Sequence, residues 1–472
     1  MHHQIRIPSQ ARRASVSTLI PFALILFAAL FCESVLGTAE DSTPHVGGSD
    51  LTASTTSVSD WLDQRITQAM HLYTWLHAHP EVSFEEQETA AKLAGLWREA
   101  GFEVTENVGG YGIVGVLKNG EGPTVMLRTD LDALPVTEQT PVSYASTQTV
   151  TREDGSSTGV MHACGHDIHM TNLTTVLQWL AEHRKSWAGT IVAIGQPAEE
   201  HGAGAKAMLE DGLFERFPRP DFALAMHVTS DKATGKITLR PGFSQANVDS
   251  VDITMKGRGG HGSAPHTTID PIVQAAELVL SLQMIVSREI APIEPAVITV
   301  GSIHGGTKHN VIGNDCTLQL TVRSYSPDIR QQLLEAIRRR ALGIAATHAA
   351  PEPDVVLSEG TPSLKNDLEL AARMQLVFGK QLGAENVIQD QPSMGGEDFS
   401  RYGIAGVPIL MYGVGSVSQA RLDRFAKLGI PPASLHSAVY YPDAEETLRV
   451  SVPAMILAVV ELMPSNATDS PN

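Results

Sequence analysis

Four short apolar runs, separated by long segments with helical spacing of apolar residues, limit this chain to a few architectures. The runs cover residues 124–127, 190–194, 222–226 and 408–412. An apolar run of this length indicates a strand that is buried on both faces. Such strands alternating with helices are typical of an α/β layer architecture with a largely buried sheet. Ahead of the first run, the pattern over residues 61–104 predicts two helices and a strand.

A different pattern occupies residues 248–358. It predicts a strand through Val251, Ile253 and Met255, then a helix over 271–290, strands over 296–303 and 315–323, a helix over 327–348 and a strand around Val355. The order βαββαβ is the ferredoxin-like arrangement. A helix predicted over residues 367–382 then resumes the first pattern. We therefore expect a second domain inserted into the first.

The length of 472 residues is too great for one compact core and agrees with two or three domains. We place the first part of the main domain at residues 58–246, the inserted domain at 247–359 and the second part of the main domain at 360–465. The formal net charge of -18 disfavours a nucleic-acid partner, because phosphate contacts need a basic surface. Solubility is a sufficient explanation for the acidity.

The first 39 residues resemble a secretory signal peptide. Arg6, Arg12 and Arg13 precede an apolar run over residues 19–31, and small residues follow around Gly37. The run is shorter than the ~20 residues that a membrane span needs, although a retained anchor is the alternative. We expect export to the periplasm or the medium, with no stable membrane span after cleavage. Residues 40–57, rich in Ser, Thr, Gly and Asp, are predicted to form a flexible linker.

Polar side chains follow three of the predicted strands. Asp130 and Asp132 come after the first run, Glu199 and Glu200 after the second, and His227 after the third. In open α/β sheets, ligands bind at the carboxyl ends of the strands. Any one of these residues alone could be a helix cap or a turn former. Together they predict a functional site at one edge of the sheet.

The strongest local signal is the cluster Met161-His162-Ala163-Cys164-Gly165-His166-Asp167-Ile168-His169. Cys164 and His166 are two residues apart, so in an extended segment their side chains point the same way. Thiolate and imidazole are good ligands for divalent metals, and their softness favours zinc. Helix capping and burial in a core are the alternative roles for this cluster. Cys316, in an alternating strand pattern, is interpreted as a small core residue.

A pair of adjacent carboxylates, Glu199 and Glu200, can divide two roles. Neighbouring side chains in an extended turn point in different directions, so one can bind metal while the other takes a proton from water. An exposed acidic turn would have the same sequence. Counted with Cys164, His166, His227 and His436, Glu200 completes five ligands, enough for two metal ions that share a bridging ligand.

The inserted domain carries a glycine-rich loop around His261. Glycines on both sides allow close approach of the backbone to a ligand, and His261 could donate to an oxyanion. Asn310 and Arg323 are further candidates for substrate binding, and Arg323 is suited to a bidentate grip on a carboxylate. A structural hairpin and a structural ion pair are the alternatives for His261 and Arg323.

These motifs together resemble the M20 metallopeptidase family, in particular its amidohydrolase branch of hippurate, N-acyl-amino-acid and auxin-conjugate hydrolases. The resemblance extends over nearly everything after residue 57. It is carried by residues 77–81, 84–86, 128–135, 161–169, 199–200, the His261 loop, 310–312, 395–399 and His436. Three positions depart from the family pattern near the expected substrate pocket: Ile168, Gly313 and Gly396.

The resemblance implies a zinc-peptidase-like α/β catalytic domain with an inserted ferredoxin-like lid that mediates homodimerisation. It implies Glu199 as general base, Asp132 as support for the metal site, and His261 as a residue reaching the substrate from the lid. The ligands would be Cys164, His166, Glu200, His227 and His436, holding two divalent ions per subunit (Zn, Mn, Ni or Co).

We therefore expect hydrolysis of an N-acyl amino acid or a small peptide-like amide. A metallo-carboxypeptidase or dipeptidase acting on small peptides is the alternative enzyme. The alternative from another class is an exported binding protein that closes on its ligand without chemistry. Glu199 distinguishes the two classes, because a binding protein has no use for a general base.

Overall fold

The computed structural model describes residues 51–152, 154–358 and 360–465. Within these residues the larger sheet has eight strands in the order β1-β2-β6-β3-β7-β18-β8-β17. The strands are Glu103–Glu106 (β1), Ile113–Asn119 (β2), Thr124–Asp130 (β3), Gly189–Gln196 (β6), Phe222–Ala233 (β7), Ile237–Leu239 (β8), Val387–Gln389 (β17) and Ile409–Val417 (β18). The central strands β6, β3, β7 and β18 are parallel, whereas β1, β2 and β8 pair antiparallel with a neighbour.

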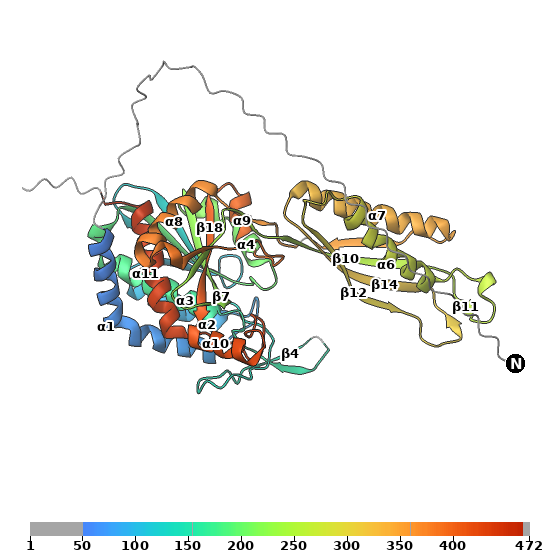
Figure 1. The fold of residues 1–472 in the computed structure, drawn as a ribbon, viewed down its shortest axis with the longest axis horizontal. Helices are drawn as coiled ribbons and strands as arrows, with labels where there is room; N and C mark the ends of the chain where they lie inside the picture. Colours follow the sequence, from blue (N-terminus) through green and yellow to red (C-terminus); the bar gives the residue numbers. More distant parts are fainter. Residues whose placement is uncertain (1–50, 153, 359, 466–472) are drawn as a thin grey trace, which may run out of the picture. The chain divides into compact units, whose positions relative to one another are not determined.

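Helices cover both faces of this sheet, as the continuous apolar strands predict (Figure 1). Adjacent residues Ile191 and Val192 of β6 point into two different cores, because side chains alternate along a strand. One core is built with Leu51–Ala78 (α1), Gln87–Glu99 (α2), His166–Glu182 (α3), Leu368–Leu382 (α8) and Ala444–Leu462 (α11). The other includes residues of Gly204–Glu210 (α4), Leu213–Arg216 (α5) and Ser400–Ile404 (α9).

The second sheet has four antiparallel strands in the order β12-β14-β10-β15. They are Asn247–Lys256 (β10), Ala296–Gly305 (β12), Asp315–Ser324 (β14) and Asp354–Ser358 (β15), and Pro271–Arg288 (α6) and Pro327–Thr347 (α7) pack on one face (Figure 1). Along the chain the order is βαββαβ, so the predicted ferredoxin-like arrangement is confirmed. Each helix begins with proline after a capping side chain, Asp270 before α6 and Ser326 before α7.

Short elements complete the described chain. Gly242–Gln245 (β9) pairs with Leu364–Asn366 (β16), so the chain enters and leaves the second sheet side by side. The other short strands and helices include Thr149–Thr151 (β4), Ser157–Gly159 (β5), Gly260–His261 (β11), Val311–Ile312 (β13) and Gln419–Leu428 (α10), and three single turns of 3-10 helix lie at Arg184–Ser186, Pro265–Thr267 and Ala384–Asn386. The domain limits at 246/247 and 359/360 stay predictions.

The N-terminal predictions fall largely outside the described residues. The predicted signal peptide, residues 1–39, and most of the predicted linker are not among the residues that the structure describes. Helix α1 begins at Leu51, inside the segment of residues 40–57 that was predicted as linker. Among the described residues, no helix has the length and apolar character to cross a membrane.

Candidate metal centre

The five predicted ligands come from four places in the fold and meet in one cluster. Cys164 and His166 lie at the start of α3, Glu200 follows β6, His227 is in β7, and His436 lies between α10 and α11. The Sγ of Cys164 is 3.5 Å from Nε2 of His227 and 3.3 Å from Nε2 of His436. The Oε1 of Glu200 is 3.8 Å from Nε2 of His166 and 3.5 Å from Nε2 of His436.

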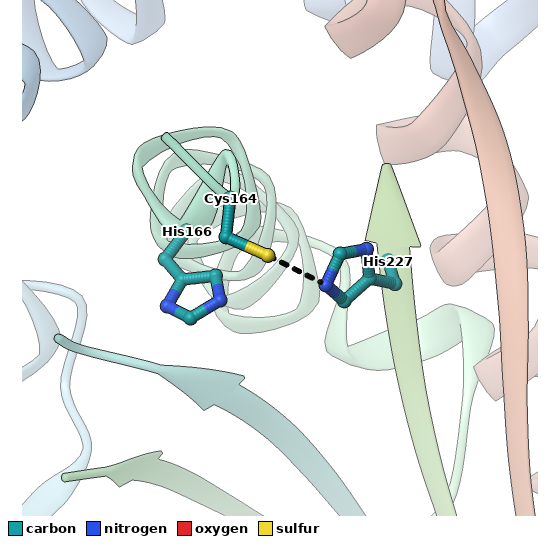
Figure 2. Close-up of side chains that lie close together, drawn as sticks. All are labelled: Cys164, His166 and His227. Atoms are coloured by element: carbon teal, nitrogen blue, oxygen red, sulfur yellow. Dashed lines mark hydrogen bonds between the residues drawn. The ribbon is translucent and has the colours of Figure 1, made fainter. Parts of the chain in front are cut away.

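Figure 2 shows Cys164 directed from the start of α3 toward the ring of His227 on its strand. His227 was expected to follow its strand, and this was wrong. Strand β7 continues to Ala233, because its partner β18 extends the parallel pairing beyond His227.

Two of the histidines have the orientation that metal-binding histidines adopt. The Nδ1–H of His166 donates to the backbone carbonyl of Asp132 at 2.7 Å, and the Nδ1–H of His227 donates to the carbonyl of Val228 at 2.8 Å. Each ring therefore presents a lone pair on Nε2 to the cluster. The Nε2 of His166 and the Oε1 of Glu200 are buried and have no hydrogen-bond partner in the described structure. Such a set of donors fits a divalent cation, which would satisfy both atoms.

His436 has a strained backbone conformation, and a backbone hydrogen bond fixes its position. Its φ is +66°, a left-handed conformation that non-glycine residues seldom adopt, and its N–H donates to the carbonyl of Ala163 at 2.9 Å. This hydrogen bond fixes the His436 loop beside Cys164. The His436 side chain is 55% exposed, whereas His166 is fully buried, so the open side of the cluster lies at His436.

His169 lies next to the cluster but has no free nitrogen. Its Nε2 accepts the N–H of Val228 at 3.0 Å, so its Nδ1 carries the proton and donates to Oδ1 of Asp130 at 2.7 Å. Burial lowers the pKa of His169 to about 4, which agrees with a neutral ring. His169 therefore supports Asp130 and the backbone of β7, and it leaves no lone pair for a metal ion.

Asp132, which the family resemblance gives as support for the metal site, contacts two of the candidate ligands. Its carbonyl orients His166, and its Oδ2 accepts the N–H of Glu200 at 3.0 Å and the hydroxyl of Ser83 at 2.6 Å. Burial opposes the charge of Asp132, yet the contacts with His166, Ser83 and Glu200 hold its pKa below the usual value.

Glu199 lies on the buried side of the same turn. Its Oε2 is 3.9 Å from Nε2 of His166, and its side chain faces two further acids, Glu397 and Asp398. Burial, followed by the charges of Glu397 and Glu200, raises the pKa of Glu199 well above the usual range. A carboxylate in such surroundings holds a proton readily, which suits a group that takes up and returns protons.

Arg128, which the sequence interpretation did not single out, stabilises this acidic group. Its Nη1 donates to Oδ2 of Asp130 at 2.6 Å, and its Nη2 donates to Oε1 of Glu397 at 2.9 Å and to Oδ1 of Asp398 at 3.4 Å. The guanidinium is almost fully buried. The signal for Arg128 was its place two residues before Asp130 in a buried strand, where a lone cation requires anionic partners.

The cluster opens into a cavity of about 900 Å³. Arg323 lines it, but Nη1 of Arg323 donates to the carbonyl of Met394 at 2.7 Å and Nε donates to Thr321, so only part of the guanidinium is free. His261 and Asn310 do not line this cavity; the exposed His261 is in β11, and Asn310 accepts a hydrogen bond from the N–H of Gly262. Of the three departures from the family pattern, Gly396 alone lines the cavity.

The sequence pattern of peptidase family M20/M25/M40 matches residues 126–426. The chain belongs to this family. Hippurate hydrolase of Campylobacter jejuni is 37% identical over 328 residues, which are 69% of this chain and 82% of that protein. Thermostable carboxypeptidase 1 of Saccharolobus solfataricus is 34% identical over 349 residues, 73% of this chain and 83% of the relative.

Among solved structures, the fold resembles that of YXEP from Bacillus subtilis, described as a dinuclear metal binding peptidase from the M20 family. The TM-score is 0.70 at 29% identity, over 85% of this chain and 99% of that one. Membership of the M20 family makes this chain a metal-dependent hydrolase of amide bonds. The predicted recognition, fold class and enzyme class are thereby confirmed.

Proposed function

We propose that this M20 hydrolase cleaves N-acyl amino acids or small peptide-like amides. The observation that carries the proposal is the convergence of Cys164, His166, Glu200, His227 and His436, with buried lone pairs that have no partner in the described structure. We assign these five residues to two divalent ions per subunit. Thiolate and imidazole favour zinc over manganese, nickel or cobalt in this set. Bound there, the ions would polarise the scissile carbonyl and lower the pKa of water.

The protein's own groups then move the protons. Glu199 takes a proton from the attacking water and returns it to the nitrogen of the leaving amine as the amide bond breaks. Its position on the buried side of the cluster keeps the carboxyl out of bulk water. Glu200, on the other side of the same turn, is directed to His166 and His436 and is left to the metal ions.

The test is release of free amino acid from a panel of N-acyl amino acids by the wild-type protein and by Glu199→Gln. We expect chelator-sensitive hydrolysis by the wild type and a decrease in kcat by a factor of about 100 to 10,000 in the variant, the range for loss of a general base. Glu210→Gln, on an exposed side chain of α4, is the matched control and should retain full activity.

Carboxypeptidase activity is the second candidate, favoured by the relative named as a carboxypeptidase. Small peptides added to the same panel distinguish the two activities. Release of amino acid from the peptides but not from the N-acyl amino acids would favour the carboxypeptidase. Ligand binding by both proteins with release of amino acid by neither would instead indicate a binding protein.

We also propose export and a homodimer formed through the inserted domain. Exposed apolar side chains on α6, namely Ile272, Val273, Leu280 and Met284, support such an interface. N-terminal sequencing of the protein from the culture medium or periplasm tests the first proposal. Light scattering tests the second, since a mass of one chain at micromolar concentration would contradict it.

A further inference from the structure

A buried carboxylate in the loop between α1 and α2 contacts the turn that carries Glu199 and Glu200. Glu86 is fully buried, and its Oε1 accepts two backbone hydrogen bonds, from the N–H of Ala198 at 2.8 Å and from the N–H of Phe84 at 2.9 Å. Residues 86 and 198 are far apart in sequence. One oxygen atom therefore ties the loop after α1 to the turn after β6.

Both residues that donate to Glu86 have strained backbone. Ala198 has a φ of +48° and Phe84 a φ of +64°, in the left-handed region that side chains other than glycine seldom occupy. Strained residues persist only where the surrounding structure holds them. The carboxylate of Glu86 is the hydrogen-bond partner that both residues share.

The strain at Ala198 sets the direction of the two residues that follow it. The carbonyl of Ala198 accepts the N–H groups of Ala203 and Gly204, and the N–H of Glu200 donates to Asp132. Glu86 thus fixes the backbone before Glu199, and Asp132 fixes it after Glu199. A change at either anchor would turn the Glu199 and Glu200 side chains together.

Other roles for Glu86 find little support in its contacts. It stands at the N-cap of α2, yet its side chain makes no capping hydrogen bond to that helix. Its Oε2 is buried without a hydrogen-bond partner among the described residues, and no ion pair there involves Glu86. The strong contacts of the carboxylate are those to Ala198 and Phe84.

We propose that Glu86 is a positioning residue for the reaction, which holds Glu199 and Glu200 in place through the backbone of Ala198. The inference rests on the proposed function, because it takes Glu199 as the base and Glu200 as a ligand. It requires an acceptor atom at this position and does not require a negative charge.

The experiment compares Glu86→Met, which removes the acceptor at similar volume, with Glu86→Gln, which keeps a carbonyl oxygen in its place. Steady-state hydrolysis of the best N-acyl amino acid should show kcat at least tenfold lower in Glu86→Met, with KM within about twofold of wild type. Glu86→Gln should stay within fivefold of wild type in kcat. Glu85→Met, on the exposed neighbouring side chain, is the control and should be unchanged.

A second comparison separates positioning from general stability. Glycine adopts the conformation of Ala198 without strain, so Ala198→Gly added to Glu86→Met should recover part of the lost kcat. Unchanged kcat in Glu86→Met, or an equal loss in Glu86→Gln, would overturn the inference. If Glu86→Met does not fold, Glu86→Asp takes its place. The same decrease in kcat is expected, because the shorter side chain moves the carboxylate oxygens away from the N–H of Ala198 by one methylene. Absence of hydrolysis by the wild type would overturn the proposed function and this inference together.

Discussion

The two cysteines of the described chain have different surroundings, although both are buried and unpaired. The Sγ of Cys164 faces the Nε2 atoms of His227 and His436, whereas Cys316 is part of the apolar core of the second sheet. A sulfur atom next to two imidazoles suits a soft divalent ion, which supports the proposed role of Cys164, whereas a thiol among aliphatic side chains acts as a small apolar residue.

This contrast predicts the effect of replacing each cysteine by serine. A hydroxyl is a poor substitute for a thiolate, so Cys164→Ser should lower the affinity for zinc by at least about tenfold, measured by competition with a chromophoric chelator. Cys316→Ser is the matched control and should bind zinc as the wild type does. Equal affinities for the two variants would remove Cys164 from the set of ligands.

Local spacing could suggest some of the candidate ligands, whereas the isolated His227 and His436 were added by their place in the chain and by the family resemblance. Cys164 and His166 are two positions apart, and Glu199 and Glu200 are adjacent, so their spacing alone suggested ligands. His169 lies in the same cluster and could be separated from the ligands only by its hydrogen bonds to Asp130 and Val228. These partners lie in other elements, so the spacing of residues in the sequence does not indicate them.

At the scale of elements, His77 connects the end of α1 to the start of α3. Its Nδ1 is 2.7 Å from Oδ2 of Asp167, and its Nε2 is 3.0 Å from Oε1 of Glu138. Burial alone would lower the pKa of His77, but the hydrogen bonds to Asp167 and Glu138 outweigh burial and raise it to about 9. The rings of Tyr73 and Tyr144 pack against it and leave the two carboxylates as its charged partners.

The raised pKa of His77 predicts how stability depends on pH. Its stabilisation is complete below the ordinary pKa of 6.5 and is lost as the pH rises through about 9. At roughly 1.4 kcal/mol per pKa unit, the free energy of unfolding should fall by about 3 kcal/mol over this range. Denaturant unfolding between pH 6 and 9.5 should show this decrease in wild type and not in His77→Gln. Parallel curves for the two proteins would contradict the prediction.

The elements that the sequence predicted well carry their own end signals. In the inserted domain, Asp270-Pro271 and Ser326-Pro327 mark the starts of α6 and α7, and strict alternation marks β10 and β14. The short strand β8 escaped prediction, because three residues carry too little periodicity. The extension of β7 past His227 depends on pairing with β18, which is distant in the chain.

At the scale of the whole molecule, Arg128 joins segments that the inserted domain separates in sequence. Asp130 precedes the insertion, and Glu397 and Asp398 follow it, yet all three carboxylates contact one guanidinium. Fold class and insertion could be read from periodicity. The contacts that join the two parts of the main domain could not be predicted in this way, because they link residues more than two hundred positions apart.

Removal of this cation should destabilise the main domain strongly. Arg128→Met leaves three buried carboxylates without their counter-ion, and breaking a buried ion pair from one side costs about 3–5 kcal/mol. The free energy of unfolding from urea titration should fall by that amount. Arg98→Met, which breaks the exposed pair with Glu106, is the matched control and should cost at most about 1 kcal/mol. A similar small decrease in unfolding free energy in both variants would mean that the three carboxylates do not need Arg128 as a counter-ion. The two parts of the main domain would then be held together by its apolar cores alone.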